Sequence, residues 1–209
     1  MTAPAWLVVL PVAASYVVGS IPWAYLAGRL IKGVDLRTFG SGNLGTTNVL
    51  RLLGMPAAIA VYALDAAKGF VPVTVFPIVF GFVPREELAI ACGVAAILGH
   101  VRPVFLLWQG GGKGVATASG VFLGLTPVAT IIALAGFVTM MFTTRIMSLA
   151  SLTGAAIIPI AVALTDGWRS PVFAASMVVA GFVVWMHRAN IGRLRRGEEP
   201  RLGRLGPTS

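Results

Sequence analysis

Long apolar runs separated by short polar pieces restrict the fold of this chain more than any other feature. A helix needs about 20 mostly apolar residues to cross a hydrocarbon core of about 30 Å, and several runs reach that length. Charged residues make up only 11% of the chain, against about 25% in a soluble domain. The sequence therefore predicts an all-α polytopic membrane protein. The apolar runs lie at roughly 6–26, 55–83, 88–108, 115–142, 149–165 and 172–185.

The basic residues indicate the orientation. Two of the polar breaks, 84–87 and 166–171, hold one basic residue each, Arg85 and Arg169. Nearly all other basic residues lie in the remaining polar pieces, which should be cytoplasmic because Lys and Arg accumulate on that side. The net charge of +9 is carried by few charged groups in a mostly apolar chain. It therefore indicates orientation in the membrane and attraction to anionic head groups or substrates, rather than binding of nucleic acid. The basic pieces are 29–51, 100–114, the surroundings of Arg145, and the segment from His187 onward.

This orientation requires an extra crossing between residues 114 and 145. Both ends of that charge-free stretch are assigned to the cytoplasm, so the stretch must cross twice. Thr126 followed by Pro127 is typical of a helix start, with Thr at the N-cap and Pro at the first position. Two short central helices of about 13–15 residues, ~20 Å each, complete a seven-helix bundle with its N-terminus outside and its C-terminus cytoplasmic. The alternative is one long tilted helix, which moves the C-terminus to the other side.

The length suits one transmembrane domain, residues 1–192, followed by a basic cytoplasmic tail, residues 193–209. The first charge is Arg29, so the first run is expected to be a retained helix rather than a cleaved signal peptide. Cys92 is the only cysteine, which excludes a disulfide within the chain and favours a small buried side chain.

The first polar loop contains glycines, small donors and a guanidinium. Glycines allow a tight backbone, and exposed N–H groups with hydroxyls and Arg51 would form a phosphate nest. Glycine–asparagine runs also form ordinary turns, so both interpretations stay open. The residues concerned are Gly40, Ser41, Gly42, Asn43, Gly45, Thr46, Thr47, Asn48 and Arg51.

The second polar loop surrounds Lys113 with glycines directly before a predicted helix. A P-loop would need glycine at 107 and a hydroxyl residue at 114, but these positions hold Leu107 and Gly114. An ATP site is therefore disfavoured, whereas binding of an anion by Lys113 and the following helix start remains. The glycines are Gly110, Gly111, Gly112 and Gly114.

Polar residues at helix ends and within spans are further candidates. His187 and Asn190, three apart, share a helix face. Asp65 and Lys68 can pair at i and i+3, either as a functional site or as a structural salt bridge. Arg145, with Ser148 and Ser151 following, offers another anion ligand.

Three long motifs resemble the signatures of the bacterial acyl-phosphate:glycerol-3-phosphate acyltransferase (PlsY) family, in order and over nearly the whole chain. Thr46 departs from the alanine usual there, and Gly110 extends the glycine run. The motifs are Gly40-Ser-Gly-Asn-Leu-Gly-Thr-Thr-Asn-Val-Leu-Arg51, Gly99-His100 followed by Gly111-Gly-Lys-Gly-Val-Ala-Thr117, and His187-Arg-x-Asn-Ile-x-Arg-Leu-x-x-Gly-x-Glu199.

The resemblance implies transfer of a fatty acyl group from acyl phosphate, not acyl-CoA, to the 1-hydroxyl of sn-glycerol 3-phosphate. Lysophosphatidic acid and phosphate would be the products, without cofactor or metal. The expected partners are sn-glycerol 3-phosphate, long-chain acyl phosphate and membrane lipid, and no nucleic acid. The expected protein is a monomer in the bacterial inner membrane with its active site facing the cytoplasm. The H-x-x-x-x-D motif of other glycerolipid acyltransferases is absent, because Phe105 and Gly192 stand five residues after the two histidines.

The candidate residues divide into two roles under this hypothesis. His187 is the candidate general base, although a phosphoryl oxygen of the substrate is an equal alternative. A phosphate transporter and a metal-dependent phosphotransferase are the rival classes, but no inverted repeat and no carboxylate cluster is apparent. The catalytic candidates are His187, Asn190, Lys113 and Ser41. The phosphate-binding candidates are Arg51, Arg145, Gly111, Gly112, Gly114, Asn43, Thr46, Asn48, Thr117, Lys68 and Ser148.

Overall fold

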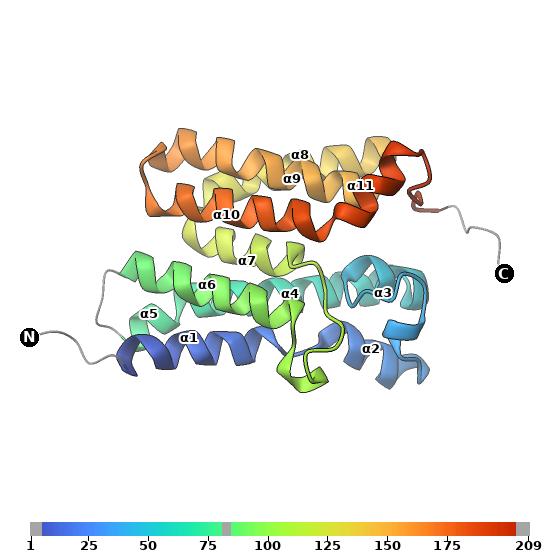
Figure 1. Cartoon of the computed structure of the whole chain (residues 1–209), viewed down its shortest axis with the longest axis horizontal. Helices are drawn as coiled ribbons and strands as arrows, with labels where there is room; N and C mark the ends of the chain where they lie inside the picture. The colour runs from blue at the N-terminus through green and yellow to red at the C-terminus, as the bar shows by residue number, and fades with distance from the viewer. Residues whose placement is uncertain (1–5, 81–84, 204–209) are drawn as a thin grey trace, which may run out of the picture. The chain divides into compact units, whose positions relative to one another are not determined.

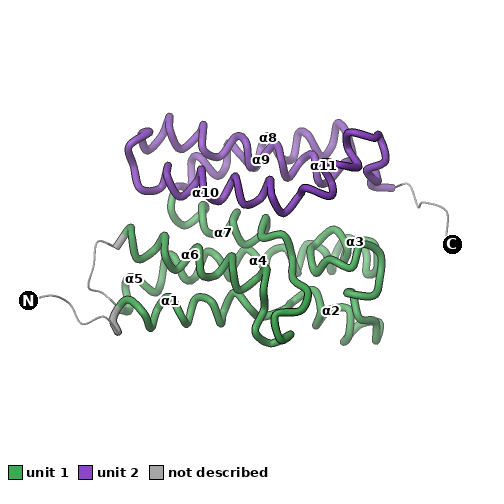
Figure 2. Tube along the Cα trace, viewed as in Figure 1, with its two compact units in different colours: residues 1–125 green, residues 126–209 purple. Residues whose placement is uncertain are grey.

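The computed structural model describes residues 6–80 and 85–203, and within these ranges the chain is helical with no strand. The predicted all-α class is therefore confirmed. The chain divides after Leu125 into two compact units (Figures 1 and 2). Five helices of the described residues are long and apolar enough to cross a membrane, or up to six if one bent pair is a single span.

The first unit contains the helices up to Leu125. Its long helices are α1 (Trp6–Gly19), α2 (Trp23–Lys32), α4 (Met55–Thr74), α6 (Arg85–Val101) and α7 (Val115–Leu125). Short elements connect them: η1 (Leu36–Thr38), α3 (Thr46–Leu53), α5 (Phe76–Val79) and η2 (Val104–Leu106). The helix pairs α1–α6 and α4–α7 make its most extensive contacts.

Glycines let these helix pairs approach at backbone distance. A Cβ added to Gly19 of α1 would lie 2.2 Å from the carbonyl oxygen of Ala96 in α6. A Cβ added to Gly120 of α7 would lie 1.8 Å from the carbonyl oxygen of Ala66 in α4. Small residues at helix contacts are typical of membrane proteins, where association depends on close packing. The glycines thus allow these two helix pairs to pack this closely.

The first apolar run forms two helices rather than one. Helix α1 ends at Gly19, and α2 begins after Pro22. Proline lacks the N–H that a continuing helix needs and disfavours helical geometry in the preceding residue. The break exposes the backbone carbonyl of Ile21, which becomes part of the site described below.

The second unit contains α8 (Pro127–Thr144), α9 (Met147–Val162), the π-helical turn η3 (Ala163–Gly167), α10 (Pro171–Met186) and α11 (Arg188–Arg195). Helix α9 packs against both α8 and α10. The chain breaks at Thr126 as predicted, so no single long helix runs from 115 to 144. The expected lengths of about 13–15 residues are wrong for both helices, since α7 has 11 residues and α8 has 18.

Thr126 stands at the N-cap of α8, but its side chain does not cap the helix. Its hydroxyl instead donates to Asp166 Oδ2 over 2.7 Å, and the hydroxyl of Thr165 donates to the same oxygen. The N-cap position was thus predicted correctly, whereas the acceptor of the Thr126 hydroxyl, Asp166, lies 40 residues further along the sequence.

Candidate active site

The glycine loop, residues 109–114, is held from two sides. The side-chain amide of Asn43 donates to the carbonyl of Gly111 over 3.1 Å, and the backbone N–H of Leu44 donates to the same carbonyl over 3.2 Å. The N–H of Gly112 donates to the carbonyl of His100 over 3.2 Å. The first and second polar loops therefore meet at Gly111, as a joint phosphate site would require.

Gly114 ends this loop with φ at +83°, a conformation that glycine adopts without strain. Helix α7 starts at the next residue, so its first N–H groups follow Lys113 directly. Lys113 itself is partly buried, whereas Thr117 lies buried in the first turn of α7. Such a helix start with a nearby cation favours an anion.

The first polar loop is organised by Asn48. This side chain is almost fully buried, and its amide donates to the carbonyls of Leu36 and Phe39 over 3.1 and 2.9 Å. Its oxygen accepts the backbone N–H of Ser41 over 3.3 Å. Asn48 is thus a framework residue of the loop in this structure, and the Ser41 side chain lies on the exposed side.

Thr46 begins α3, and Arg51 lies exposed in the last turn of that helix. None of the hydrogen bonds that hold the glycine loop involves the Thr46 hydroxyl or the Arg51 guanidinium. The loop before them begins at Asp35, whose carboxylate accepts hydrogen bonds from Arg37 and caps η1. The Arg37 guanidinium holds the pKa of Asp35 below its usual value, against the opposing effect of partial burial.

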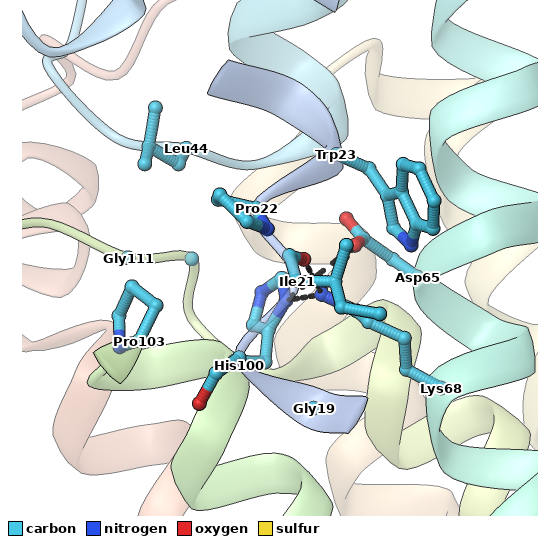
Figure 3. Close-up of a pocket in the computed structure, with 12 residues that line it drawn as sticks. Gly19, Ile21, Pro22, Trp23, Leu44, Asp65, Lys68, His100, Pro103 and Gly111 are labelled. Carbon is cyan, nitrogen blue, oxygen red and sulfur yellow. Dashed lines mark hydrogen bonds and ion pairs between the residues drawn. The ribbon is translucent and has the colours of Figure 1, made fainter. Parts of the chain in front are cut away.

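A small cavity of about 200 Å³, including its open mouth, lies between these loops and the helix break (Figure 3). Three ionisable side chains meet in it: Lys68 Nζ lies 2.8 Å from Asp65 Oδ1 and 3.1 Å from His100 Nδ1. The predicted i,i+3 pair of Asp65 and Lys68 is therefore present. Gly111 and Gly112 line the same cavity.

The second unit carries the remaining candidates around the end of α10. His187 is buried at the junction of α10 and α11, and its Nδ1 lies 2.8 Å from the carbonyl of Val183. A carbonyl can only accept, so Nδ1 carries a proton, and Nε2 is the basic nitrogen of the neutral ring. Asn190 follows in α11 and donates to Glu199 Oε1 over 2.6 Å.

The Glu199 carboxylate links Asn190 and Arg193, two other residues of the third motif. Arg193 donates to Glu199 Oε2 over 2.7 Å. Burial acts to raise the pKa of Glu199, but hydrogen bonds from Asn190, Ser148 and Arg193 hold it below the usual value. Ser148 is buried, and its hydroxyl falls short of ordinary hydrogen-bond geometry, so Asn190 and Arg193 are the secure partners.

Arg145 follows α8 in left-handed conformation with φ at +58°. Its carbonyl accepts the N–H of Leu202 over 2.7 Å. The beginning of the segment predicted as a basic tail is thus bonded to the second unit, through Leu202 at Arg145 and through Glu199 at α11. The Arg145 side chain is exposed.

The structure therefore groups the candidates of each unit separately. In the first unit it joins Asn43, Gly111, Gly112 and Lys68 through one network. In the second it joins Asn190 to Arg193 through Glu199. Sequence reasoning missed Glu199 as a partner, although its place in the third motif was a signal. It also missed His100 as a site residue, although Gly99-His100 begins the second motif.

No group of three or more His, Cys, Asp or Glu residues that could hold a metal occurs within the described ranges.

Comparison with known proteins decides the family. The sequence model of the family described as glycerol-3-phosphate acyltransferase matches residues 9–197. The chain belongs to the glycerol-3-phosphate acyltransferase family. A family member from Anaeromyxobacter sp. (strain Fw109-5) is 47% identical over 91% of this chain and 94% of its own length. Another, from Synechococcus sp. (strain CC9902), is 43% identical over 94% of this chain and 96% of its own.

Solved structures of the family have the same fold. The crystal structure of PlsY (YgiH), an integral membrane glycerol 3-phosphate acyltransferase in its glycerol 3-phosphate form, gives a TM-score of 0.85 at 35% identity. It covers 94% of this chain and 96% of that one. The lysophosphatidic acid form gives a TM-score of 0.83 at 34% identity, covering 94% and 95%. Together with the apolar helices, this family membership makes the chain a multi-span integral membrane protein, and it confirms the resemblance seen in the motifs.

Proposed function

We propose that this chain transfers a fatty acyl group from acyl phosphate to the 1-hydroxyl of sn-glycerol 3-phosphate, in phospholipid biosynthesis. The hydroxyl oxygen attacks the acyl carbonyl, the bond from that carbon to the phosphate oxygen breaks, and a base takes the hydroxyl proton. Lysophosphatidic acid and inorganic phosphate leave. The related PlsY structures are named for their glycerol 3-phosphate and lysophosphatidic acid forms, which fits this acceptor and this product.

The glycine loop carries the proposal. Its backbone is fixed by Asn43 and by the His100 carbonyl, which accepts the Gly112 N–H, so Lys113 and the other N–H groups of the loop are positioned before a phosphate arrives. Preorganised donors stabilise developing negative charge because they need no reorganisation during the reaction. We assign Lys113 and the backbone N–H groups of Gly111 and Gly114 to binding of phosphate and to stabilisation of the acyl oxyanion, and Gly112, expected from the sequence to bind phosphate, to holding the loop on His100.

The remaining candidates complete the proposed assignments. They supply cations, hydroxyls and a helix start, the groups that favour phosphate in proteins. Their shared role is to align two phosphate-bearing substrates, since acyl phosphate is already activated and alignment is the main requirement. These residues are Ser41, Thr46, Arg51, Thr117, Arg145 and Ser148.

His187 is suited to accept the hydroxyl proton. Its Nδ1–H is directed at the Val183 carbonyl, which leaves Nε2 as the basic nitrogen in the neutral ring. Histidine is the side chain that most often serves as a general base. A phosphoryl oxygen of a substrate is the alternative acceptor, in which case His187 and Asn190 orient the substrate.

The topology is part of the proposal. We propose a monomer with seven crossings in the bacterial inner membrane, N-terminus outside, C-terminus and active site cytoplasmic, in which residues 1–192 form the transmembrane domain and 193–209 the basic segment. The clustering of Lys and Arg in the motif loops supports this orientation. Thiol labelling of single cysteines placed at 38, 110 and 167 in the Cys92→Ala background tests it in intact cells. Residues 38 and 110 should react only after permeabilisation, and 167 before it.

Phosphate release by the purified protein tests the reaction. With palmitoyl phosphate in detergent, we expect release of inorganic phosphate only when glycerol 3-phosphate is present, together with formation of lysophosphatidic acid. Palmitoyl-CoA should not replace palmitoyl phosphate. Equal turnover with palmitoyl-CoA would refute acyl phosphate as the specific acyl donor. Phosphate release independent of glycerol 3-phosphate would refute glycerol 3-phosphate as the acyl acceptor.

A further inference from the structure

Three ionisable side chains that face one another in the first unit have no role in the reaction as proposed above. Asp65, Lys68 and His100 are 1%, 4% and 7% exposed, and all three lie in helices that qualify as membrane spans. Ionisable groups at such depth are expensive and are usually retained for a function. We call Asp65, Lys68 and His100 the buried triad.

Lys68 is the centre of the buried triad. Its ammonium group lies 2.8 Å from Asp65 Oδ1, 3.1 Å from His100 Nδ1 and 2.8 Å from the Ile21 carbonyl. These three acceptors match the three hydrogens of an ammonium. The contact with Asp65 is an ion pair whose angle departs from ordinary hydrogen-bond geometry. Lys68 thus points into the protein and not toward a phosphate.

The position of Lys68 defines the state of His100. An ammonium group donates and never accepts, so Nδ1 must accept from Lys68, and the proton of the neutral ring must lie on Nε2. The contact from His100 Nδ1 to Asp65 Oδ1 is 3.6 Å, too long for a hydrogen bond. His100 is therefore held in one tautomer and one orientation by Lys68, and Lys68 is neutralised by Asp65.

The His100 ring in turn abuts the glycine loop. A Cβ added to Gly112 would lie 1.9 Å from His100 Nε2, so the ring rests directly on the Gly112 backbone. The N–H of Gly112 also donates to the His100 carbonyl. Gly112 directly precedes Lys113, so the orientation of the ring determines where the loop places that lysine.

The Ile21 carbonyl links the helix break to the same network. The break between α1 and α2 leaves this partly buried carbonyl with one backbone donor, the N–H of Trp23 over 3.1 Å, and Lys68 supplies a second donor over 2.8 Å (Figure 3). Lys68 therefore fastens α4 to the helix break, while the Trp23 N–H keeps the Ile21 carbonyl paired when Lys68 is replaced. The buried triad thereby ties α4, the end of α6, the helix break and the glycine loop into one rigid group.

We propose that Asp65, Lys68 and His100 are positioning residues that hold the glycine loop, and Lys113 with it, in the phosphate-binding conformation. This replaces direct phosphate binding as the role of Lys68. The proposal rests on the proposed function, because its readout is the kinetics of that reaction.

Paired variants separate positioning from simple stabilisation. Lys68→Met leaves the Asp65 carboxylate buried without compensation, which strongly destabilises a protein, whereas removing both charges is often neutral. The double variant Asp65→Leu with Lys68→Met should therefore melt close to the wild type. It still lacks the donor to His100 and Ile21, so we expect the KM for at least one substrate to rise about tenfold or more, with kcat changed less.

Two further variants test the link through His100. His100→Asn keeps an acceptor near the Nδ1 position, and His100→Ala removes it; we expect a smaller rise in KM for Asn than for Ala. The pH profile of kcat should keep its wild-type shape in His100→Asn, because His100 does not exchange a proton. Thr130→Val is the matched control, since Thr130 is equally buried and donates only to the Thr126 carbonyl of its own helix.

The outcomes are distinct. A double variant with wild-type melting and wild-type KM for both substrates would overturn the positioning role, as would equal inactivation by Asn and Ala at position 100. Absence of glycerol 3-phosphate-dependent phosphate release in the wild type would instead overturn the proposed function.

Discussion

Replacement of Asn48 by alanine provides a quantitative test of how the first polar loop is built. The variant removes three hydrogen bonds, to the carbonyls of Leu36 and Phe39 and from the N–H of Ser41. The two carbonyls keep a second donor each, because they also accept from the backbone N–H groups of Phe39 and Gly42. Only the Ser41 N–H loses the partner described here.

The loss can be estimated from these contacts. A hydrogen bond contributes about 0.5–1.5 kcal/mol net, and the two carbonyls lose only one of two bonds, so we expect about 2 kcal/mol in total. For a chain of this size that corresponds to a drop of about 4–8 °C in melting temperature. The KM for a phosphate substrate should rise as well, because the loop that holds Gly111 through Asn43 loses its framework.

Thermal unfolding in detergent, followed by tryptophan fluorescence, measures the loss of stability. Thr38→Ala is the control, since Thr38 lies in the same loop, is exposed and makes one side-chain hydrogen bond to the Asp35 carbonyl. If Asn48→Ala melts like the control while substrate binding is lost, Asn48 acts on the phosphate directly. The framework reasoning would then be refuted.

Three other substitutions test the site. The pKa of Glu199 is lowered in the folded chain, so the ionised carboxylate stabilises the fold above the unfolded pKa of about 4.3, and this stabilisation disappears as the pH falls through the lower folded value. Glu199→Gln should therefore lower the melting temperature at neutral pH. Its melting temperature should also fall less steeply with decreasing pH than that of the wild type. Gly112→Ala, which places a Cβ on His100, should raise the KM at least about tenfold. Gly181→Ala is its control, because nothing lies near the added Cβ; its free energy of unfolding should equal that of the wild type or exceed it by up to ~1 kcal/mol. Lys113→Ala should lower kcat/KM about 100-fold at unchanged melting temperature; wild-type turnover would exclude the proposed role of that lysine.

The positions of the helices follow from local rules, and these were predictable. Thr126 and Pro127 predicted the break between α7 and α8 because N-cap and first-position preferences depend on neighbouring residues only. Asp65 and Lys68 were expected to pair because helical spacing places them on one face. The break at Pro22 was missed, because the apolar composition of the run concealed the effect of the proline.

Contacts between distant residues were not predictable in the same way. Asn48 was assigned to phosphate binding because its loop has the composition of a phosphate nest, but the carbonyls that surround it come from the turn 36–39. His100 reaches Lys68 across 32 residues of sequence, and this contact depends on how α4 packs beside α6. The motifs thus identified the family, whereas the partners of the residues within them required the structure.

The pairing of Asp65 with Lys68 one helical turn away also bears on how this chain enters the membrane. Each charge alone would oppose insertion of its segment by about 2.5–3.5 kcal/mol. Their partners Ile21 and His100 lie on other segments, and His100 belongs to the following span, residues 86–106, which inserts after residues 55–79. The pair of Asp65 and Lys68 can form within the helix itself, so residues 55–79 can enter the membrane as a nearly neutral helix. The contact with His100 can form later, when the helices pack. A chain with Asp65 moved to position 66, off that face, should insert residues 55–79 less efficiently even before any tertiary structure forms.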